Sequence, residues 1–199
     1  MRSSGPQIVL VRHGETEWSK NVKHTSYSDI LLTLEGERQA SVLKGELSGW
    51  DFKLVLCSPR QRARRTCELA GYLGHAEITD DLTEWNYGEY EGITTKEIRQ
   101  TAPGWTVFDS PTPGGETPDQ VAARCDSVIA RLRALHDDAL LFAHSHVLRV
   151  LIARWLNLPA KSGRHFVLQT GTLNILSYEH ESPVLISLNA ETFRNDPRR

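Results

Sequence analysis

The 199-residue sequence has few cysteines, no apolar run of membrane-spanning length and little net charge. Its three cysteines, Cys57, Cys67 and Cys125, are odd in number and lack a zinc or disulfide spacing, so we expect a reducing compartment, by default the cytoplasm. The net charge of −2 provides no global attraction to nucleic acid or to a membrane. The apolar run at residues 8–11 is too short for a signal peptide core or a membrane span. Any recognition of an anion must therefore be local.

Short apolar segments predict a sheet within one domain, residues 1–199, long enough to bury roughly 70% of the surface of the unfolded chain. The expected strands are residues 7–11, 53–57, 139–143, 172–178 and 183–188. The first three are continuously apolar, which is typical of parallel strands buried on both faces. The last two, separated by a short polar segment, predict an antiparallel hairpin or edge pair.

Helical patterns alternate with these strands. The expected helices are residues 33–47, 59–73, 117–135 and 145–156. The clearest begins at Thr117, which acts as a cap, with Pro118 at the first helical position and Gln120 completing a capping box. Residues 105–118 are rich in proline and glycine and predict a loop within a long irregular insertion. The chain is therefore expected to form a three-layer α/β/α sandwich, with a mostly parallel sheet and an antiparallel edge strand.

Cationic and polar residues follow the first three strands where each strand ends. Arg12 and His13 follow the first strand, residues 58–62 the second and residues 144–146 the third. Because the carboxyl ends of parallel strands open toward one crevice, we expect these side chains to meet. Guanidinium groups and the helix N-termini behind the strands suit a phosphate dianion. The sequence therefore predicts a phosphate pocket.

Three kinds of reacting group are compatible with this pocket. Cys57 ends the second strand, but the sixth residue after it is Ala63, where cysteine phosphatases need an arginine. A metal ion held by His13, His144 and His146 would be opposed by the neighbouring arginines. A histidine nucleophile is favoured, because nearby arginines keep an imidazole neutral and reactive near pH 7. We therefore expect no metal and no other cofactor.

The leaving alcohol needs a proton, and residues 81–92 supply acids among aromatic residues and glycines. Glu84 is flanked by Leu82 and Trp85 and is expected to be the acid best shielded from water, as suits a general acid. Glu89 and Glu91 are interpreted as surface acids or caps.

Five sequence blocks together resemble the histidine phosphatase superfamily, in its phosphoglycerate mutase-like branch. They are LVRHGETEW (10–18), SPRQRARRT (58–66), LTEWNYGEYEG (82–92), GGET (114–117) and FAHSH (142–146). They occur in the family's order, and the resemblance extends from residue 8 to the closing hairpin. It implies a phosphoglycerate mutase-like fold.

The resemblance also implies catalytic roles. His13 matches the nucleophile that becomes phosphohistidine, and Glu84 matches the proton donor that then activates water. Arg12, Arg62 and His144 match the groups that hold the phosphoryl oxygens.

Other positions match or depart from the family on the substrate side. Thr25 and Tyr87 match positions that line the substrate. Ser19 stands where mutases have asparagine, and Ser26 and Ser145 stand where the family commonly has glycine. Since glycine permits positive φ or close approach of a ligand, Ser145 is expected to narrow the pocket or to add a hydroxyl to it.

The resemblance favours a metal-independent phosphomonoesterase that acts on a small phosphorylated metabolite, a sugar phosphate or bisphosphate. The segment 93–115 is shorter than the insertion of the mutases, and a more open site favours hydrolysis over transfer. The alternatives are a cofactor-dependent phosphoglycerate mutase and a non-catalytic phosphate-binding relative. Trp105, Phe108 and residues 111–115 are expected to form part of the substrate-side wall. The sequence indicates neither a particular sugar nor an oligomeric state.

Overall fold

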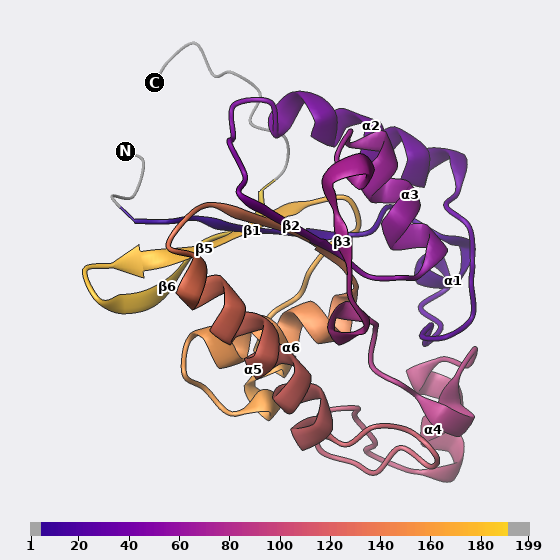
Figure 1. Cartoon of the computed structure of the whole chain (residues 1–199). Helices are drawn as coiled ribbons and strands as arrows, with labels where there is room; N and C mark the ends of the chain where they lie inside the picture. The colour runs from indigo at the N-terminus through magenta and orange to yellow at the C-terminus, as the bar shows by residue number, and fades with distance from the viewer. Residues whose placement is uncertain (1–4, 191–199) are drawn as a thin grey trace, which may run out of the picture.

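A six-stranded sheet forms the centre of the computed structural model, which describes residues 5–190 (Figure 1). Its strands are β1 (Ile8–Arg12), β2 (Leu54–Cys57), β3 (Glu77–Ile78), β4 (Ala139–Ala143), β5 (Leu173–Glu179) and β6 (Ser182–Ala190). Their order is β3-β2-β4-β1-β5-β6, in which β5 and β6 are antiparallel and the other strands pair in parallel. This confirms the mostly parallel sheet with an antiparallel edge. The ends of the predicted 1–199 domain, residues 1–4 and 191–199, lie outside the described residues.

Helices cover both faces of the sheet, as expected of an α/β/α sandwich. They are α1 (Glu17–Lys20), α2 (Leu34–Glu46), α3 (Gln61–Leu69), α4 (Thr95–Thr101), α5 (Pro118–Leu135) and α6 (Ser145–Trp155). Short 3-10 turns are η1 (Leu73–His75), η2 (Asp80–Leu82), η3 (Gly88–Tyr90) and η4 (Ala160–His165). In Figure 1, α2 and α3 lie above the sheet, and α5 and α6 lie below it. The predicted capping box of Thr117 and Gln120 is present at the start of α5.

The central strands are buried on both faces. In β1, Ile8 and Leu10 belong to the core shared with α5 and α6, whereas Val9 and Val11 belong to the core shared with α2 and α3. This two-sided burial explains why the sequence shows continuous rather than alternating apolar runs. Among residues 5–190, no helix has the length and apolar character needed to cross a membrane.

Three small elements escaped the sequence analysis. Strand β3 consists of two exposed residues and so has no apolar run. Helices α1 and α4 have no buried residue and one buried residue respectively, so neither has an apolar stripe that would reveal its period. Helix α4 therefore interrupts the insertion that we expected to be wholly irregular, whereas residues 105–117 form a loop as predicted.

The strand order brings the three predicted polar strand ends together. Strand β4 lies between β1 and β2, so all three strands end at the same edge of the sheet. Helix α3 begins shortly after β2, and α6 begins shortly after β4. The same edge therefore receives two helix N-termini as well as the strand-end side chains.

Candidate active site

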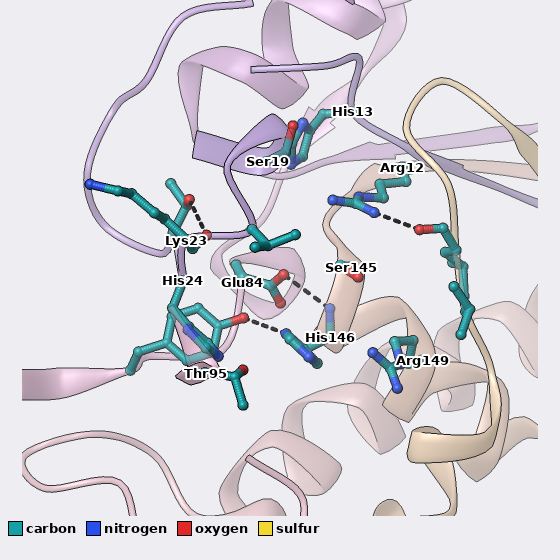
Figure 2. A pocket seen from close by; sticks show the side chains of 15 residues that line it. Arg12, His13, Ser19, Lys23, His24, Glu84, Thr95, Ser145, His146 and Arg149 are labelled. Carbon is teal, nitrogen blue, oxygen red and sulfur yellow. Dashed lines mark hydrogen bonds between the residues drawn. The ribbon is translucent and has the colours of Figure 1, made fainter. Parts of the chain in front are cut away.

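A cavity of about 300 Å³ lies at the carboxyl ends of the central strands (Figure 2). Arg12 and His13 reach it from the end of β1, and Ser145 and His146 reach it from the start of α6. Glu84 reaches it from the segment that follows η2. Its other lining residues are Ser19, Val22, Lys23, His24, Thr25, Tyr87, Thr95, Arg149, Val167 and Leu168. The structure therefore brings the first and third strand ends together with Glu84 in one cavity.

The imidazole of His13 is held as a neutral group. Its side chain is 5% exposed, and its Nδ1 lies 2.7 Å from the carbonyl oxygen of Gly14. Because a carbonyl can only accept, Nδ1 carries the proton and Nε2 keeps a free lone pair. Burial, together with the positive charges of Arg62 and Arg12, holds the pKa of His13 well below its usual range.

The Arg62 side chain is 1% exposed and lies behind the lining of the cavity rather than within it. Its Nε donates to His144 Nδ1 at 3.2 Å, and Nη1 donates to the carbonyl of Ser28 at 3.0 Å. Nη2 donates to the carbonyls of Thr25 and Ser26, both at 3.1 Å. A guanidinium has five N–H groups, so a single N–H remains for a ligand. Arg62 thus fastens residues 25–28 to the start of α3.

His144 is fully buried beside His13, with ring centroids 5.2 Å apart. Since its Nδ1 accepts from Arg62, its Nε2 carries the proton and donates to Ser58 Oγ at 2.7 Å. Burial and the nearby charge of Arg62 hold the pKa of His144 well below its usual range. Like Arg62, it lies behind the lining of the cavity.

Arg12 keeps part of its guanidinium available. Its Nη1 donates to the carbonyl of Leu168. Its Nε is buried and has no hydrogen-bond partner within residues 5–190. A buried donor without an acceptor is costly, so this group is suited to an anion in the cavity.

The Glu84 carboxylate is held by backbone N–H groups. Its side chain is 4% exposed. Oε1 accepts from the amides of Trp85 and Val147 at 2.9 and 2.8 Å, and Oε2 accepts from the amide of His146 at 3.0 Å. We expected the N-terminus of α6 to serve phosphate directly, but two of its amides bind Glu84 instead. Oε2 accepts one hydrogen bond from the protein and therefore retains a position at which it can accept a proton.

Tyr87 and two histidines, His24 and His146, form another side of the cavity. The Tyr87 hydroxyl lies 2.6 Å from His146 Nδ1. Burial and the nearby Glu84 raise the pKa of Tyr87 well above its usual range, so its hydroxyl stays protonated and donates. The His24 ring is parallel to that of His146, with an interplanar angle of 3° and centroids 6.1 Å apart.

Sequence reasoning missed three cationic or titratable residues of this cavity. They are Lys23, His24 and Arg149. Arg149 follows His146 by three residues in α6, a spacing that places both on one helix face. That spacing was the available signal. Neither Lys23 nor His24 has a comparable local pattern, because both lie in the irregular segment that follows α1.

Two predicted substrate-side residues line the cavity while their hydroxyls serve the backbone. Ser19 Oγ donates to the carbonyl of Thr16 and accepts from its amide, which completes a capping box at the start of α1. Thr25 Oγ1 donates to the carbonyl of Lys23 at 3.1 Å. Both hydroxyls are therefore engaged within the protein.

The two serines that replace family glycines adopt ordinary backbone conformations. Neither Ser26 nor Ser145 has a positive φ, so a side chain causes no backbone strain there. Ser26 is fully buried, and its Oγ donates to the carbonyl of Glu84 at 3.1 Å. Ser145 lines the cavity and adds a hydroxyl-bearing side chain to it (Figure 2). This is one of the two effects that the sequence analysis expects of a serine at this position.

The remaining candidates from the sequence analysis lie outside the catalytic cavity. Glu91 accepts hydrogen bonds from the amides of Ser26 and Ser28, so it caps residues 25–28, the segment that Arg62 also binds. Glu89 is exposed. Cys57 is fully buried. Over residues 5–190, no three histidine, cysteine, aspartate or glutamate side chains are grouped closely enough to hold a metal ion.

The fold and this cavity together define a phosphatase of one family. Residues 8–191 match the family described as the histidine phosphatase superfamily (branch 1). The chain belongs to this superfamily. This is the family that the five sequence blocks resemble, so the predicted family and its phosphatase class are confirmed.

Individual relatives make the placement more specific. The chain is 42% identical over 180 residues to an acid phosphatase of Mycobacterium tuberculosis, and the match covers 87% of each chain. It is 31% identical over 227 residues to the sedoheptulose 1,7-bisphosphatase of Saccharomyces cerevisiae, covering 98% of this chain and 82% of the relative. A solved structure of an open reading frame product from M. tuberculosis has a TM-score of 0.88 and 37% identity, covering 92% of this chain and 97% of that chain. These likenesses confirm the predicted phosphoglycerate mutase-like fold.

Proposed function

We propose that this protein is a metal-independent phosphomonoesterase that works through a phosphohistidine formed on His13. One observation carries the proposal: a buried imidazole, neutral and protonated at Nδ1, lines the same cavity as Arg12. A neutral imidazole is a nucleophile, and a guanidinium binds the phosphoryl group that it attacks.

In the first step the lone pair of His13 Nε2 attacks phosphorus. The N–P bond forms while the bond from phosphorus to the ester oxygen breaks. The carboxyl group of Glu84 donates its proton to the leaving oxygen, which departs as an alcohol. Arg12 binds the phosphoryl oxygens through its uncommitted N–H groups. Arg62 contributes its charge and its remaining N–H, and a phosphoryl oxygen replaces Ser58 as the acceptor for His144 Nε2.

In the second step water attacks the phosphohistidine. The Glu84 carboxylate, now without its proton, accepts one from the water as the new O–P bond forms. The N–P bond breaks, its electron pair returns to His13 Nε2, and inorganic phosphate leaves. The cycle restores every group without an external cofactor.

The substrate that we propose is a small phosphorylated metabolite, either a sugar phosphate or a sugar bisphosphate. The likeness to a sedoheptulose 1,7-bisphosphatase supports this class. The cavity of about 300 Å³ is at the small end of ligand sites. Ser19, Thr25, Tyr87 and Ser145 line it and would face the sugar. We place the reaction in the cytoplasm because the three cysteines are free and buried.

Replacing the nucleophile tests the mechanism. His13→Ala is expected to abolish hydrolysis of p-nitrophenyl phosphate, whereas His75→Ala, at an exposed histidine, is the matched control. Brief mixing with radiolabelled substrate, followed by an alkaline quench in which phosphohistidine survives, should label the wild-type chain and not His13→Ala. Hydrolysis by His13→Ala at a rate near that of the wild type would overturn the assignment.

A second measurement separates the alternatives to hydrolysis. On a panel of phosphosugars and phosphoglycerates, a phosphatase releases inorganic phosphate, whereas a mutase returns an isomeric phosphate ester. Failure to turn over any phosphate ester would instead indicate a binding protein. Treatment with EDTA is expected to leave the rate unchanged, and a clear loss of activity would restore the metal hypothesis.

A further inference from the structure

A second cavity, of about 230 Å³, adjoins the catalytic cavity. His24, Thr95, His146 and Arg149 line both cavities and thus form their boundary. These four residues lie together at the lower side of the view in Figure 2. We call the second space the arginine cavity, and its further lining residues are Arg99, Trp105, Thr106, Val107, Phe108 and Arg164.

Two of the three arginines that line the arginine cavity, Arg99 and Arg149, have no carboxylate partner within residues 5–190. Arg99 donates from Nε to the carbonyl of Trp105 at 2.9 Å. Arg149 donates from Nε and Nη2 to the carbonyls of Gly163 and Arg164, at 3.0 and 3.1 Å. Carbonyl acceptors orient these guanidinium groups without neutralising them. Arg164 is paired with Asp109, but no acidic residue is among the described residues that line the cavity.

The imidazoles at the boundary are fixed and have defined hydrogen-bonding roles. His24 packs against Trp105 with centroids 5.3 Å apart, and His146 packs against Phe108 at 5.4 Å. His24 Nδ1 lies 2.8 Å from the carbonyl of Ile93, so it donates and leaves Nε2 as an acceptor. His146 Nδ1 accepts from Tyr87, so its Nε2 carries a proton. The boundary therefore offers one acceptor and one donor, which is the pair that a sugar hydroxyl can satisfy.

We propose that the arginine cavity binds a second anionic group of the substrate, a phosphate or a carboxylate, at the end remote from the scissile phosphate. This inference rests on the proposed function, since it takes the scissile phosphate to bind at His13. The sugar lies at the boundary, within hydrogen-bonding reach of the two histidines, and the second anion lies against Arg99 and Arg149. Guanidinium forks match both phosphate and carboxylate oxygens. The preferred substrate class is then an extended, doubly anionic phosphosugar rather than a simple monophosphate.

The test compares substrates that differ in their second anion. Fructose 1,6-bisphosphate is compared with fructose 1-phosphate and fructose 6-phosphate, and 6-phosphogluconate is compared with glucose 6-phosphate. The variant is Arg99→Gln, which removes the charge of an exposed residue in α4. The control is Arg131→Gln, an exposed arginine that pairs with Glu77 and lines neither cavity.

In the wild type, kcat/KM for at least one doubly anionic sugar should exceed that of its singly anionic partner. Arg99→Gln should reduce that ratio about tenfold, the order expected for one lost hydrogen bond to a charged group, mainly through KM. Arg131→Gln should leave the ratio unchanged. The fructose and gluconate pairs tell a second phosphate from a carboxylate.

Two results would overturn the inference. One is a wild-type enzyme without preference for a second anion in either pair. The other is a ratio in Arg99→Gln equal to that in Arg131→Gln. Failure of the proposed mechanism is a separate observation, because it would show as hydrolysis by His13→Ala whatever the substrate ratio.

Discussion

The two sides of the catalytic cavity are built in different ways. The side that we propose to bind the phosphoryl group, called the phosphoryl side, consists of Arg12 and His13 with Arg62 and His144 behind them. These residues come from strand ends and the first turn of α3. The distal side consists of His24, Tyr87, His146 and Arg149, of which the first two lie in irregular segments. On the phosphoryl side, buried hydrogen bonds fix each ring and guanidinium. On the distal side, aromatic contacts with Trp105 and Phe108 also hold the rings. Loops carried by a rigid scaffold commonly provide specificity, which is the role that we propose for the distal side.

On both sides, nevertheless, an arginine is oriented by neutral hydrogen-bond acceptors. Arg62 is oriented by backbone carbonyls and a neutral histidine, and Arg149 is oriented by backbone carbonyls. In none of these contacts is either arginine paired with a carboxylate. Both guanidinium groups are thus fixed by neutral acceptors, and under the proposed function their charge is available to the substrate. Under the proposed function the two cations face different groups: Arg62 faces the nucleophile, which must stay neutral, and Arg149 faces the second anion of the substrate.

Glu84 lies between the two sides, and its replacement should have the largest effect in this comparison. Glu84→Gln removes the transferable proton, so turnover of an alkyl phosphate should fall roughly 10²- to 10⁴-fold. The loss should be smaller for p-nitrophenyl phosphate, whose leaving group needs little protonation. Steady-state kinetics on both substrates measure the difference, with the exposed Glu89→Gln as control. Equal losses on both substrates would indicate that Glu84 only supports the N-terminus of α6.

The buried histidines on both sides should make stability depend on pH. Burial and neighbouring cations hold the pKa of His13, His144 and His146 well below the usual range, whereas in the unfolded chain the pKa is about 6.5. The unfolded state then binds more protons below pH 6.5. The free energy of unfolding should be fully developed above pH 6.5 and should fall as the pH drops, by up to about 1.4 kcal/mol per pH unit for each group.

Urea unfolding between pH 7.5 and 5.5 measures this dependence. His144→Gln, from the phosphoryl side, and His146→Gln, from the distal side, should each reduce the slope of stability against pH, by close to one proton at the acid end of this range and by less near pH 7.5. A slope that changes in one variant alone would show that only that side keeps its histidine neutral. A wild-type stability that does not fall over this range would contradict the prediction.

Sequence reasoning could name the residues of the phosphoryl side because the signals that place them at strand ends are local. A buried strand followed by arginine and histidine can be read from a few residues, and continuous apolar runs indicate parallel strands, but the order of the strands was not predicted. The partners of Arg62 could not be read in this way. Besides His144, its acceptors are the carbonyls of residues 25, 26 and 28, and every residue type carries a carbonyl. The sequence thus predicted a phosphate-binding role for Arg62, but it did not predict the hydrogen bonds of Arg62 to residues 25–28.

The distal side depends on contacts between distant segments. His24 meets Trp105 across a large separation in sequence, and α4, which helps to place Thr95 and Arg99, has a single buried residue. Trp105 and Phe108 were expected in the substrate-side wall, and they line the arginine cavity, whereas residues 111–115 line neither of the two cavities. Arg149 alone was within reach of sequence reasoning, through its helical spacing from His146.

The smallest expected effect is at Ser145, which stands where the family commonly has glycine. Its φ is not positive, and no side-chain hydrogen bond of Ser145 occurs within the described residues. Ser145→Gly should therefore change kcat/KM for p-nitrophenyl phosphate less than about threefold and cost no more than about 1 kcal/mol of stability. Ser26→Gly is the matched comparison, because it removes a buried hydrogen bond to the carbonyl of Glu84 and should destabilise by about 1 kcal/mol. A larger loss of activity in Ser145→Gly than in Ser26→Gly would show that the Ser145 hydroxyl binds the phosphoryl group or the sugar directly, and would move Ser145 from the cavity wall into the binding site.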